Sequence, residues 1–367
     1  MSKRSSIGSF HDRSHVMIKA TFRAYKKSKY ARKRVKMIGG GYRGSGKEFR
    51  ETVRSYWSRY DVKPKRYWYA LYCNGQGAYD PRYVPDSMWY RRILPYFNNL
   101  TMRRAYTDKG MYNRLFTGVR KPETVVKNIA GYFYNGDGEE MITREEALRL
   151  CEQEAHLIFK PSLDSGGGRE IAFYDRDRED TPSVSAIFDD FGVGFVAQRL
   201  VRQHPDLARI NRESLNTVRV MSFHFNGSVH ILSAQLRMGN SGSRVDNISA
   251  GGCACAIKPD GWLSEKAVTR KSVWTDTHDS GLKFKDIRVP SYDKIIEKVT
   301  LLHCGLPYFN LIGWDFAVDE QGEPVLIEFN VMPEQNQIGS GKPTFGDLSD
   351  EVFEDVFVKK SLKDAFE

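Results

Sequence analysis

Apolar and polar positions alternate in two neighbouring segments near the C-terminal end of the chain. IGWDFAV (312–318) and PVLIEFNVM (324–332) each have the pattern of a strand, and DEQGEP between them carries a turn signal. A two-residue loop at Gln321-Gly322 would join the two segments as a β-hairpin. The pattern therefore predicts an antiparallel pair of strands whose register is set by this loop.

One face of this hairpin is predicted to carry two carboxylates and an amide. With that loop, Asp315 lies directly opposite Glu328, and Asn330 shares their face. Ile327 and Phe329 are expected to pack on the other side. Opposed carboxylates repel one another, so a shared proton, a basic side chain or a metal ion must neutralise them. A hydrated edge hairpin without a function is the alternative, but these oxygen ligands also suit Mg²⁺ bound beside phosphates.

A candidate phosphate-binding segment lies upstream, in HLIFKPSLDSGGGREIAFYD (156–175). It has the pattern of a strand, a glycine loop and a second strand, and a capping box at Thr143 and Glu146 predicts a helix before it. Lys160 ends an apolar run, where a lysine is costly unless it meets an anion. Backbone N–H groups of the glycines at 166–168 can close over phosphate oxygens, although a plain hairpin with a flexible tip is the alternative.

Two further segments surround this unit. In AYTDKGMYNRLFTGV, Lys109 stands at the start of an apparent helix, and GFVAQRLVRQHP (194–205) reads as a strand leading into a polar loop. A long hairpin follows over residues 216–239, turned at an Asn-Gly pair, and contributes Arg219 and Arg237. In an ideal register these arginines point to opposite faces, so either a bulge intervenes or only one, by preference Arg237, belongs to a site.

Composition limits the class of protein. The chain has 367 residues, of which 40% are hydrophobic and 28% charged, which is typical of a soluble globular protein with two or three compact units. No apolar run is long enough to span a bilayer. The five cysteines argue against a disulfide framework and for a reducing cytoplasm, and Cys253 and Cys255 are expected to pack within a strand.

The positive charge is concentrated at the N-terminus. Residues 1–66 hold 20 Lys and Arg against 4 Asp and Glu, a net charge of +16, and the remaining 301 residues carry −6 because the whole chain carries +10. Within this region residues 19–36 have the spacing of a basic amphipathic helix. Such a helix could be solvated or lie on the body of the protein, rest on an anionic membrane through residues 1–36, or bind nucleic acid, which is the least favoured reading.

The segment GYRGSGKE (41–48) is an incomplete match to a nucleotide-binding motif. It matches a phosphate loop up to its lysine but has Glu48 where Ser or Thr is needed for magnesium. A glycine-rich connector is the favoured interpretation.

The order of these parts resembles the ATP-grasp superfamily, which includes the D-alanine–D-alanine ligases and the ribosomal-protein glutamate ligases. More closely, YTDKGMYNRLF, LNTVRV, the Gly-Gly segment after Asn247, and IGWDFAV followed by LIEFN are similar to the sugar-transfer-associated ATP-grasp family. The resemblance covers about residues 85–340. It implies an α+β fold in which two subdomains clasp ATP, preceded here by a basic, partly helical extension.

The resemblance also implies roles for single residues. The phosphates of ATP would be held by Lys109, Lys160 and the glycines Gly166, Gly167 and Gly168, and the adenine by the linker residues Gln198, Arg199, Leu200 and Val201. One or two Mg²⁺ ions would be held by Asp315, Glu328 and Asn330 of the hairpin. The transferring group would be held by Arg219 and Arg237, and Lys160 is also counted as catalytic.

The implied activity is an ATP-dependent carboxylate–amine ligase working through an acyl phosphate. The family's association with polysaccharide biosynthesis suggests a sugar acid, small or lipid-linked, and an amine co-substrate. A kinase acting on a sugar or polyol hydroxyl is the first alternative, and a basic membrane- or RNA-binding protein with a degenerate nucleotide site is the second. The expected location is cytoplasmic, with possible attachment to the inner face of the membrane.

Five regions are expected along the chain. Residues 1–66 form the basic extension and 67–104 a connecting subdomain. Residues 105–200 form the small subdomain that covers ATP, 201–345 the large subdomain with the metal site, and 346–367 a C-terminal tail.

Overall fold

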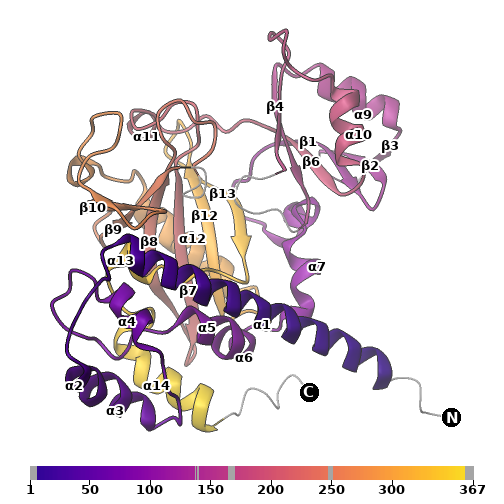
Figure 1. The fold of residues 1–367 in the computed structure, drawn as a ribbon. Coiled ribbons are helices and arrows are strands. Elements are labelled where there is room, and N and C mark those ends of the chain that lie inside the picture. Colours follow the sequence, from indigo (N-terminus) through magenta and orange to yellow (C-terminus); the bar gives the residue numbers. More distant parts are fainter. Residues whose placement is uncertain (1–5, 137, 139, 164–169, 247–250, 360–367) are drawn as a thin grey trace.

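The computed structural model describes residues 6–136, 138, 140–163, 170–246 and 251–359, with the side chains of residues 6–20 left aside (Figure 1). The fold is mixed α+β, as the resemblance implied, and contains two antiparallel sheets. Gly166 to Gly168 and Asn247 lie outside the described residues.

The smaller sheet has six strands in the order β3-β2-β1-β6-β4-β5. Its strands are β1 (Thr124–Ile129), β2 (Tyr132–Asn135), β3 (Met141–Ile142), β4 (His156–Pro161), β5 (Ala172–Asp175) and β6 (Phe195–Arg199). Helices α9 (Arg144–Glu152) and α10 (Val184–Phe191) pack against it around a core that includes Phe159 and Phe195. Thr143 accepts a hydrogen bond from the Glu146 N–H at 3.1 Å, which confirms the predicted start of α9.

The larger sheet has seven strands in the order β11-β10-β9-β8-β7-β12-β13. Its strands are β7 (Thr217–Phe225), β8 (Ser228–Met238), β9 (Cys253–Ile257), β10 (Leu263–Thr269), β11 (Trp274–Thr275), β12 (Leu311–Val318) and β13 (Pro324–Asn330). Every residue of β12 is buried because both faces of the sheet are covered. One face packs on α12 (Tyr292–Cys304), and the other packs on the N-terminal helices together with α14 (Ser349–Glu354).

The hairpin β7–β8 contains a bulge. Asn226 and Gly227 both have positive φ, at 50° and 76°, as the predicted tight turn requires. Further along, Ser222 pairs with Ile231 but Met221 pairs with Ser233, so Leu232 is the extra residue. A single inserted residue turns all later side chains of β8 to the opposite face. This bulge therefore places Arg237 on the same face as Arg219.

The β12–β13 hairpin differs from the prediction near its turn. The loop has three residues, not two: the Asp319 N–H donates to the Glu323 carbonyl (3.0 Å), and the Asp319 carboxylate accepts from the Glu323 N–H (2.8 Å). The Asp319 side chain thus favours the longer loop. A bulge at Ile327 then shifts the register back, so Asp315 lies opposite Glu328 as predicted. Ile327 is consequently only partly buried, whereas Phe329 is buried as expected.

Helix α1 (Ser6–Met37) is longer than the predicted helix at residues 19–36. It crosses the N-terminal helices and extends beyond the body of the molecule at its N-terminal end (Figure 1). Ala24 and Ala31 are 3% and 2% exposed, so its second half is packed on the body. No described helix is long and apolar enough to cross a membrane.

The remaining helices are short. Those before the smaller sheet are α2 (Gly46–Glu48), η1 (Phe49–Arg54), α3 (Ser55–Ser58), α4 (Arg66–Tyr72), α5 (Asp86–Met88), η2 (Trp89–Ile93), α6 (Leu94–Phe97), η3 (Leu100–Met102), α7 (Arg103–Thr107), η4 (Lys109–Met111) and α8 (Tyr112–Leu115). Those after it are α11 (Pro205–Ala208), η6 (Phe284–Asp286), α13 (Gln337–Ser340), η7 (Gly346–Leu348) and η8 (Asp355–Lys359).

Candidate active site

The candidate site is built on the adjacent strands β7, β12 and β13 and reaches the smaller sheet through η4 and β4. Asp315 pairs in register with Arg219 of β7 on one side and with Glu328 of β13 on the other. The backbone N–H of Lys109 donates to the Ser162 carbonyl at 2.9 Å, which fixes η4 to the end of β4. Side chains from both sheets therefore meet at one place.

Asp315 is neutralised by two arginines. Arg219 donates to both carboxylate oxygens, from Nε at 2.6 Å and from Nη2 at 2.7 Å, and Arg237 Nη2 lies 3.3 Å from Oδ2. Burial raises the pKa of Asp315, but the two guanidinium groups outweigh it and hold that pKa below its usual range. The sequence left a shared proton, a basic side chain or a metal ion as ways to neutralise the opposed carboxylates. For Asp315, the structure shows basic side chains.

Arg237 also contacts two groups that the sequence did not indicate. Its Nε and Nη2 each lie 3.1 Å from Thr217 Oγ1, and its Nη2 lies 3.5 Å from Asp246 Oδ2. Thr217 in turn donates a short hydrogen bond to Asp246. Arg237 is thus shared between Asp315 and Asp246.

The two predicted phosphate-binding lysines lie on the side of Glu328. Lys109 Nζ is 3.7 Å from Glu328 Oε1, and Lys160 Nζ lies 3.4 Å from Gln198 Oε1. Burial lowers the pKa of Lys160 to about 8, and the positive charge of Lys109 lowers it further. The carboxylates of Glu328 and Asp246 raise this pKa, but by less. A cation destabilised in this way is suited to an anionic ligand.

Asn330 has a backbone partner in this structure. Its Oδ1 accepts a hydrogen bond from the Met332 N–H at 2.8 Å, just after the end of β13. Glu328, whose side chain is 30% exposed, is more accessible than Asp315, whose side chain is 5% exposed. Tyr112 packs behind this strand, where its hydroxyl accepts a long 3.5 Å hydrogen bond from the Phe329 N–H.

The donor set fits Mg²⁺ held jointly with phosphates. Among the described residues no group of three or more His, Cys, Asp or Glu side chains is placed to bind a metal alone. Two carboxylates and an amide leave positions for phosphate oxygens and water, which is how Mg²⁺ is usually bound. Arg219 uses one lone pair on each oxygen of Asp315, and Arg237 also approaches Oδ2, so Oδ1 is the oxygen that keeps a second lone pair for a cation.

The predicted linker residues divide into two groups. Gln198 is buried, and its side chain joins Lys160 to Thr124, whose Oγ1 accepts from Nε2 at 3.2 Å. Arg199 instead points to Glu154, with Nη2 2.7 Å from Oε1, and also contacts Glu123. Leu200 is exposed and Val201 half-buried in the connection that leaves β6.

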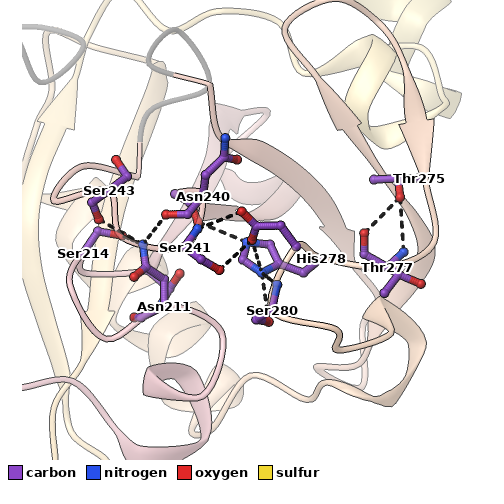
Figure 2. Close-up of polar contacts among 12 residues, drawn as sticks. Asn211, Ser214, Asn240, Ser241, Ser243, Thr275, Thr277, His278 and Ser280 are labelled. Atoms are coloured by element: carbon purple, nitrogen blue, oxygen red, sulfur yellow. Dashed lines mark hydrogen bonds and ion pairs between the residues drawn. The ribbon is translucent and has the colours of Figure 1, made fainter.

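A polar network fixes the segment that carries Asp246. Asn211 Nδ2 donates to Ser214 Oγ (2.9 Å) and to the carbonyls of Asn240 (2.9 Å) and Ser243 (3.0 Å), as Figure 2 shows. On the other side of the segment, His278 Nε2 lies 3.0 Å from the Gly239 carbonyl. Buried hydrogen-bonded networks of this kind hold a loop in one conformation.

The same segment reaches across to the smaller sheet. Arg244 Nη1 lies 3.0 Å from Asp175 Oδ2 at the end of β5, and its guanidinium lies 3.8 Å from the centre of the Phe173 ring. His156 Nδ1 contacts the other oxygen of Asp175 at 3.0 Å. Sequence reasoning missed Arg244 and Asp246; the only signal was the polar run SGSRVD before the Gly-Gly pair.

Solved structures that are similar to this chain share little of its sequence. A search of curated proteins gave no match. Similar solved structures include biotin carboxylase from Campylobacter jejuni, at 13% identity and a TM-score of 0.42, over 68% of this chain and 45% of that one. VanG D-Ala:D-Ser ligase from Enterococcus faecalis is 13% identical, with a TM-score of 0.40, over 73% of this chain and 64% of that one. The chain spans less than half the length of the biotin carboxylases that it matches.

The family assignment rests on the sequence. The model of the family described as sugar-transfer associated ATP-grasp matches residues 108–346, which is more than half of the 367 residues. The matched region includes both sheets and every predicted site residue. The chain therefore belongs to the sugar-transfer associated ATP-grasp family.

Proposed function

We propose that the protein is an ATP-dependent carboxylate–amine ligase that activates its carboxylate as an acyl phosphate. The observation that carries this proposal is the gathering of two lysines and two arginines around a pair of carboxylates. Lys109 meets Glu328, and Arg219 and Arg237 meet Asp315, on neighbouring strands. Such a site can hold a triphosphate and a divalent cation at once.

Each group has a separate role in the proposed reaction. Lys109 and Lys160 hold the phosphates of ATP, and the three oxygen ligands of β12 and β13 hold Mg²⁺, which offsets the charge on the transferring phosphoryl group. After an amine attacks the acyl phosphate, Arg237 stabilises the tetrahedral oxyanion, because a guanidinium donates hydrogen bonds in a fixed geometry. Arg219 keeps Asp315 ionised and oriented. The contact of Arg244 with Asp175 keeps the small sheet closed over the intermediate, which water would hydrolyse.

The substrate class follows from the family. Its association with sugar transfer supports a sugar acid as the carboxylate and an amino acid or another amine as the nucleophile. The test is a matrix of sugar acids against amino acids, read by ADP release and by the mass of the product. Amide formation that depends on the amine supports a ligase. Phosphate on the product without any need for an amine would identify a kinase and overturn the proposal.

We further propose that α1 holds the enzyme on an anionic membrane. Its outer side combines aromatic side chains with lysines: Phe22 is 56% exposed and Tyr25 67% exposed, and Lys26 lies 4.4 Å from the Phe22 ring centre. Lys29 and Lys33 are exposed on the same helix. Aromatic and basic side chains together are typical of surfaces that lie in the headgroup region of a bilayer. A location on the membrane would suit a lipid-linked acceptor.

A further inference from the structure

One side of α1 carries a stripe of exposed apolar and basic side chains. The stripe consists of Phe22, Lys26, Tyr30, Lys33 and Met37, all of which are exposed. These residues are three or four positions apart, and side chains at that spacing lie on the same side of a helix. The alanines on the opposite side of α1 are buried against the body of the molecule. The stripe therefore faces away from the protein.

The turn between β10 and β11 is fixed beside this stripe. The Tyr30 hydroxyl donates a hydrogen bond to the Arg270 carbonyl at 3.2 Å, and Arg34 Nε donates to Ser272 Oγ at 2.6 Å. Ser272 is buried and has a positive φ of 63°, so the turn is anchored near its middle. The turn and the stripe thus form one surface, although Tyr30 and Arg270 are 240 positions apart in the sequence.

The turn exposes two large apolar side chains. Val273 is 57% exposed and Trp274 is 39% exposed, and the neighbouring Lys271 is exposed as well. Trp262 is exposed to almost the same extent, at 40%, but it lies at the other end of β10. The other four tryptophans are at most 2% exposed, namely Trp57, Trp68, Trp89 and Trp314. A tryptophan ring is apolar but carries one N–H group, so it is well suited to the boundary between water and acyl chains.

The charge of this surface indicates its partner. The stripe and the turn contribute Lys26, Lys33 and Lys271, which surround the exposed rings and aliphatic side chains. An anionic bilayer attracts lysines and also accepts apolar side chains at its headgroup boundary. Attraction between charges acts over about 8 Å at physiological salt and does not fix which side of a protein faces the bilayer. An inserted ring does fix it.

We infer that the turn at residues 270–274 is a second membrane contact, in which Val273 and Trp274 enter the headgroup region of an anionic bilayer beside α1. This inference rests on the proposed attachment of α1 to such a membrane. Transfer of the exposed apolar area out of water adds a hydrophobic contribution to the attraction of the lysines. Two contacts held together by the hydrogen bonds of Tyr30 and Arg34 also define how the protein lies on the bilayer.

The first test asks which tryptophan enters the bilayer. It uses the full-length protein and vesicles of phosphatidylglycerol and phosphatidylcholine, with bromine on the acyl chains of the phosphatidylcholine. Bromine quenches tryptophan fluorescence only at close range. We expect quenching in the wild type and in Trp262→Phe, and little quenching in Trp274→Phe. Trp262 is the matched control because it is almost equally exposed at the far end of the same strand.

Vesicle affinity gives a second readout. We expect Trp274→Ala to bind the anionic vesicles about tenfold more weakly in co-sedimentation, because a large apolar ring is lost from the contact. Trp262→Ala should match the wild type. Val273→Glu, at the more exposed position, should weaken binding too, so the test does not depend on the folding of Trp274→Ala. Circular dichroism checks that each variant is folded.

The outcomes separate this inference from the proposed function. Vesicle-bound protein without quenching of Trp274, or equal vesicle affinity in Trp274→Ala and Trp262→Ala, would overturn the inference and leave the attachment of α1 intact. A wild type that does not bind anionic vesicles would overturn both. Neither result concerns the proposed ligase, which amide formation tests. Binding of single-stranded RNA that Trp274→Ala weakens, without binding to vesicles, would assign the surface to nucleic acid and also overturn the inference.

Discussion

At the scale of single residues, the two opposed carboxylates differ in their burial and in their charged partners. Asp315 is 3% exposed and accepts two hydrogen bonds from Arg219, whereas Glu328 is half-buried and forms a longer ion pair with Lys109, at 3.7 Å. We expect Asp315→Asn to lower the free energy of unfolding by about 3–5 kcal/mol, because it leaves buried arginines without a counter-charge. Glu328→Gln should change it by less than about 1 kcal/mol while abolishing turnover.

Urea denaturation and ADP release measure both effects. The pH dependence gives a second check, because the folded-state pKa of Asp315 is lowered. Its contribution to stability is complete above the unfolded pKa and is lost as the pH falls through the folded one, so the difference between wild type and Asp315→Asn should shrink in acid. Equal destabilisation by the two substitutions would contradict this assignment.

Lys160 is expected to lower the stability of the nucleotide-free protein and to raise its affinity for Mg·ATP. Its pKa is lowered to about 8, so a buried charge persists at neutral pH. We expect Lys160→Met to be more stable than wild type at pH 7 and to bind Mg·ATP about tenfold to a hundredfold more weakly. Between about pH 8 and 10.5 the unfolded state binds the extra proton, so wild-type stability should rise towards that of the variant.

Calorimetry and denaturation at pH 7 and pH 9.5 test the Lys160 prediction. Lys285→Met, at an exposed position, is the control and should change neither quantity. Unchanged nucleotide affinity in Lys160→Met would remove this lysine from the site.

At the scale of elements, one of the contacts that join the smaller sheet to the larger part of the molecule is the ion pair between Arg244 and Asp175. Arg244 pairs with Asp175, and this contact helps to hold the pKa of Asp175 below its usual range against burial. We expect Arg244→Gln to increase amide hydrogen exchange in β5 while leaving exchange in β12 unchanged, because only the contact between the sheets is weakened. Arg178→Gln is the matched control, since Arg178 pairs with Asp180 at 2.9 Å in an exposed position. Identical exchange in β5 for the two variants would show that Arg244 does not hold the sheet.

At the scale of the whole molecule, α1 has two sides with different tasks. Deleting residues 1–36 would uncover the surface that Ala24 and Ala31 bury, so charge reversal is the better test of membrane binding. We expect the triple substitution Lys26→Glu, Lys29→Glu and Lys33→Glu to abolish co-sedimentation with anionic vesicles, since each basic side chain near such a surface contributes about 1 kcal/mol.

Nucleotide binding should be unaffected in the α1 triple variant, and moderate salt should release the wild type. The control reverses three exposed lysines elsewhere, at positions 258, 266 and 285, and so has the same net charge. An equal loss of vesicle co-sedimentation in both triple variants would show that net charge alone, and not α1, causes membrane binding. Salt-sensitive RNA binding without vesicle binding would assign α1 to nucleic acid.

Local sequence determined much of this protein. Hydrophobic periodicity, the Asn226-Gly227 turn and the Thr143 cap were enough to predict both hairpins and α9, because these signals act within a few residues. The order of lysines, arginines and carboxylates indicated the family, and Asp315 does lie opposite Glu328. That last prediction was correct although the loop is one residue longer than expected, because the bulge at Ile327 cancels the difference.

Tertiary structure alone decided the rest. The bulge at Leu232 sets which way Arg237 points, and packing on both faces of the sheet, not local propensity, fixes such an insertion. Arg244 and Asp246 enter the site because a polar network far along the chain holds their loop. Likewise, the charge pattern of α1 predicted a basic helix, but only the fold placed Lys27 against Glu334, since contacts between residues 307 positions apart leave no local signal in sequence.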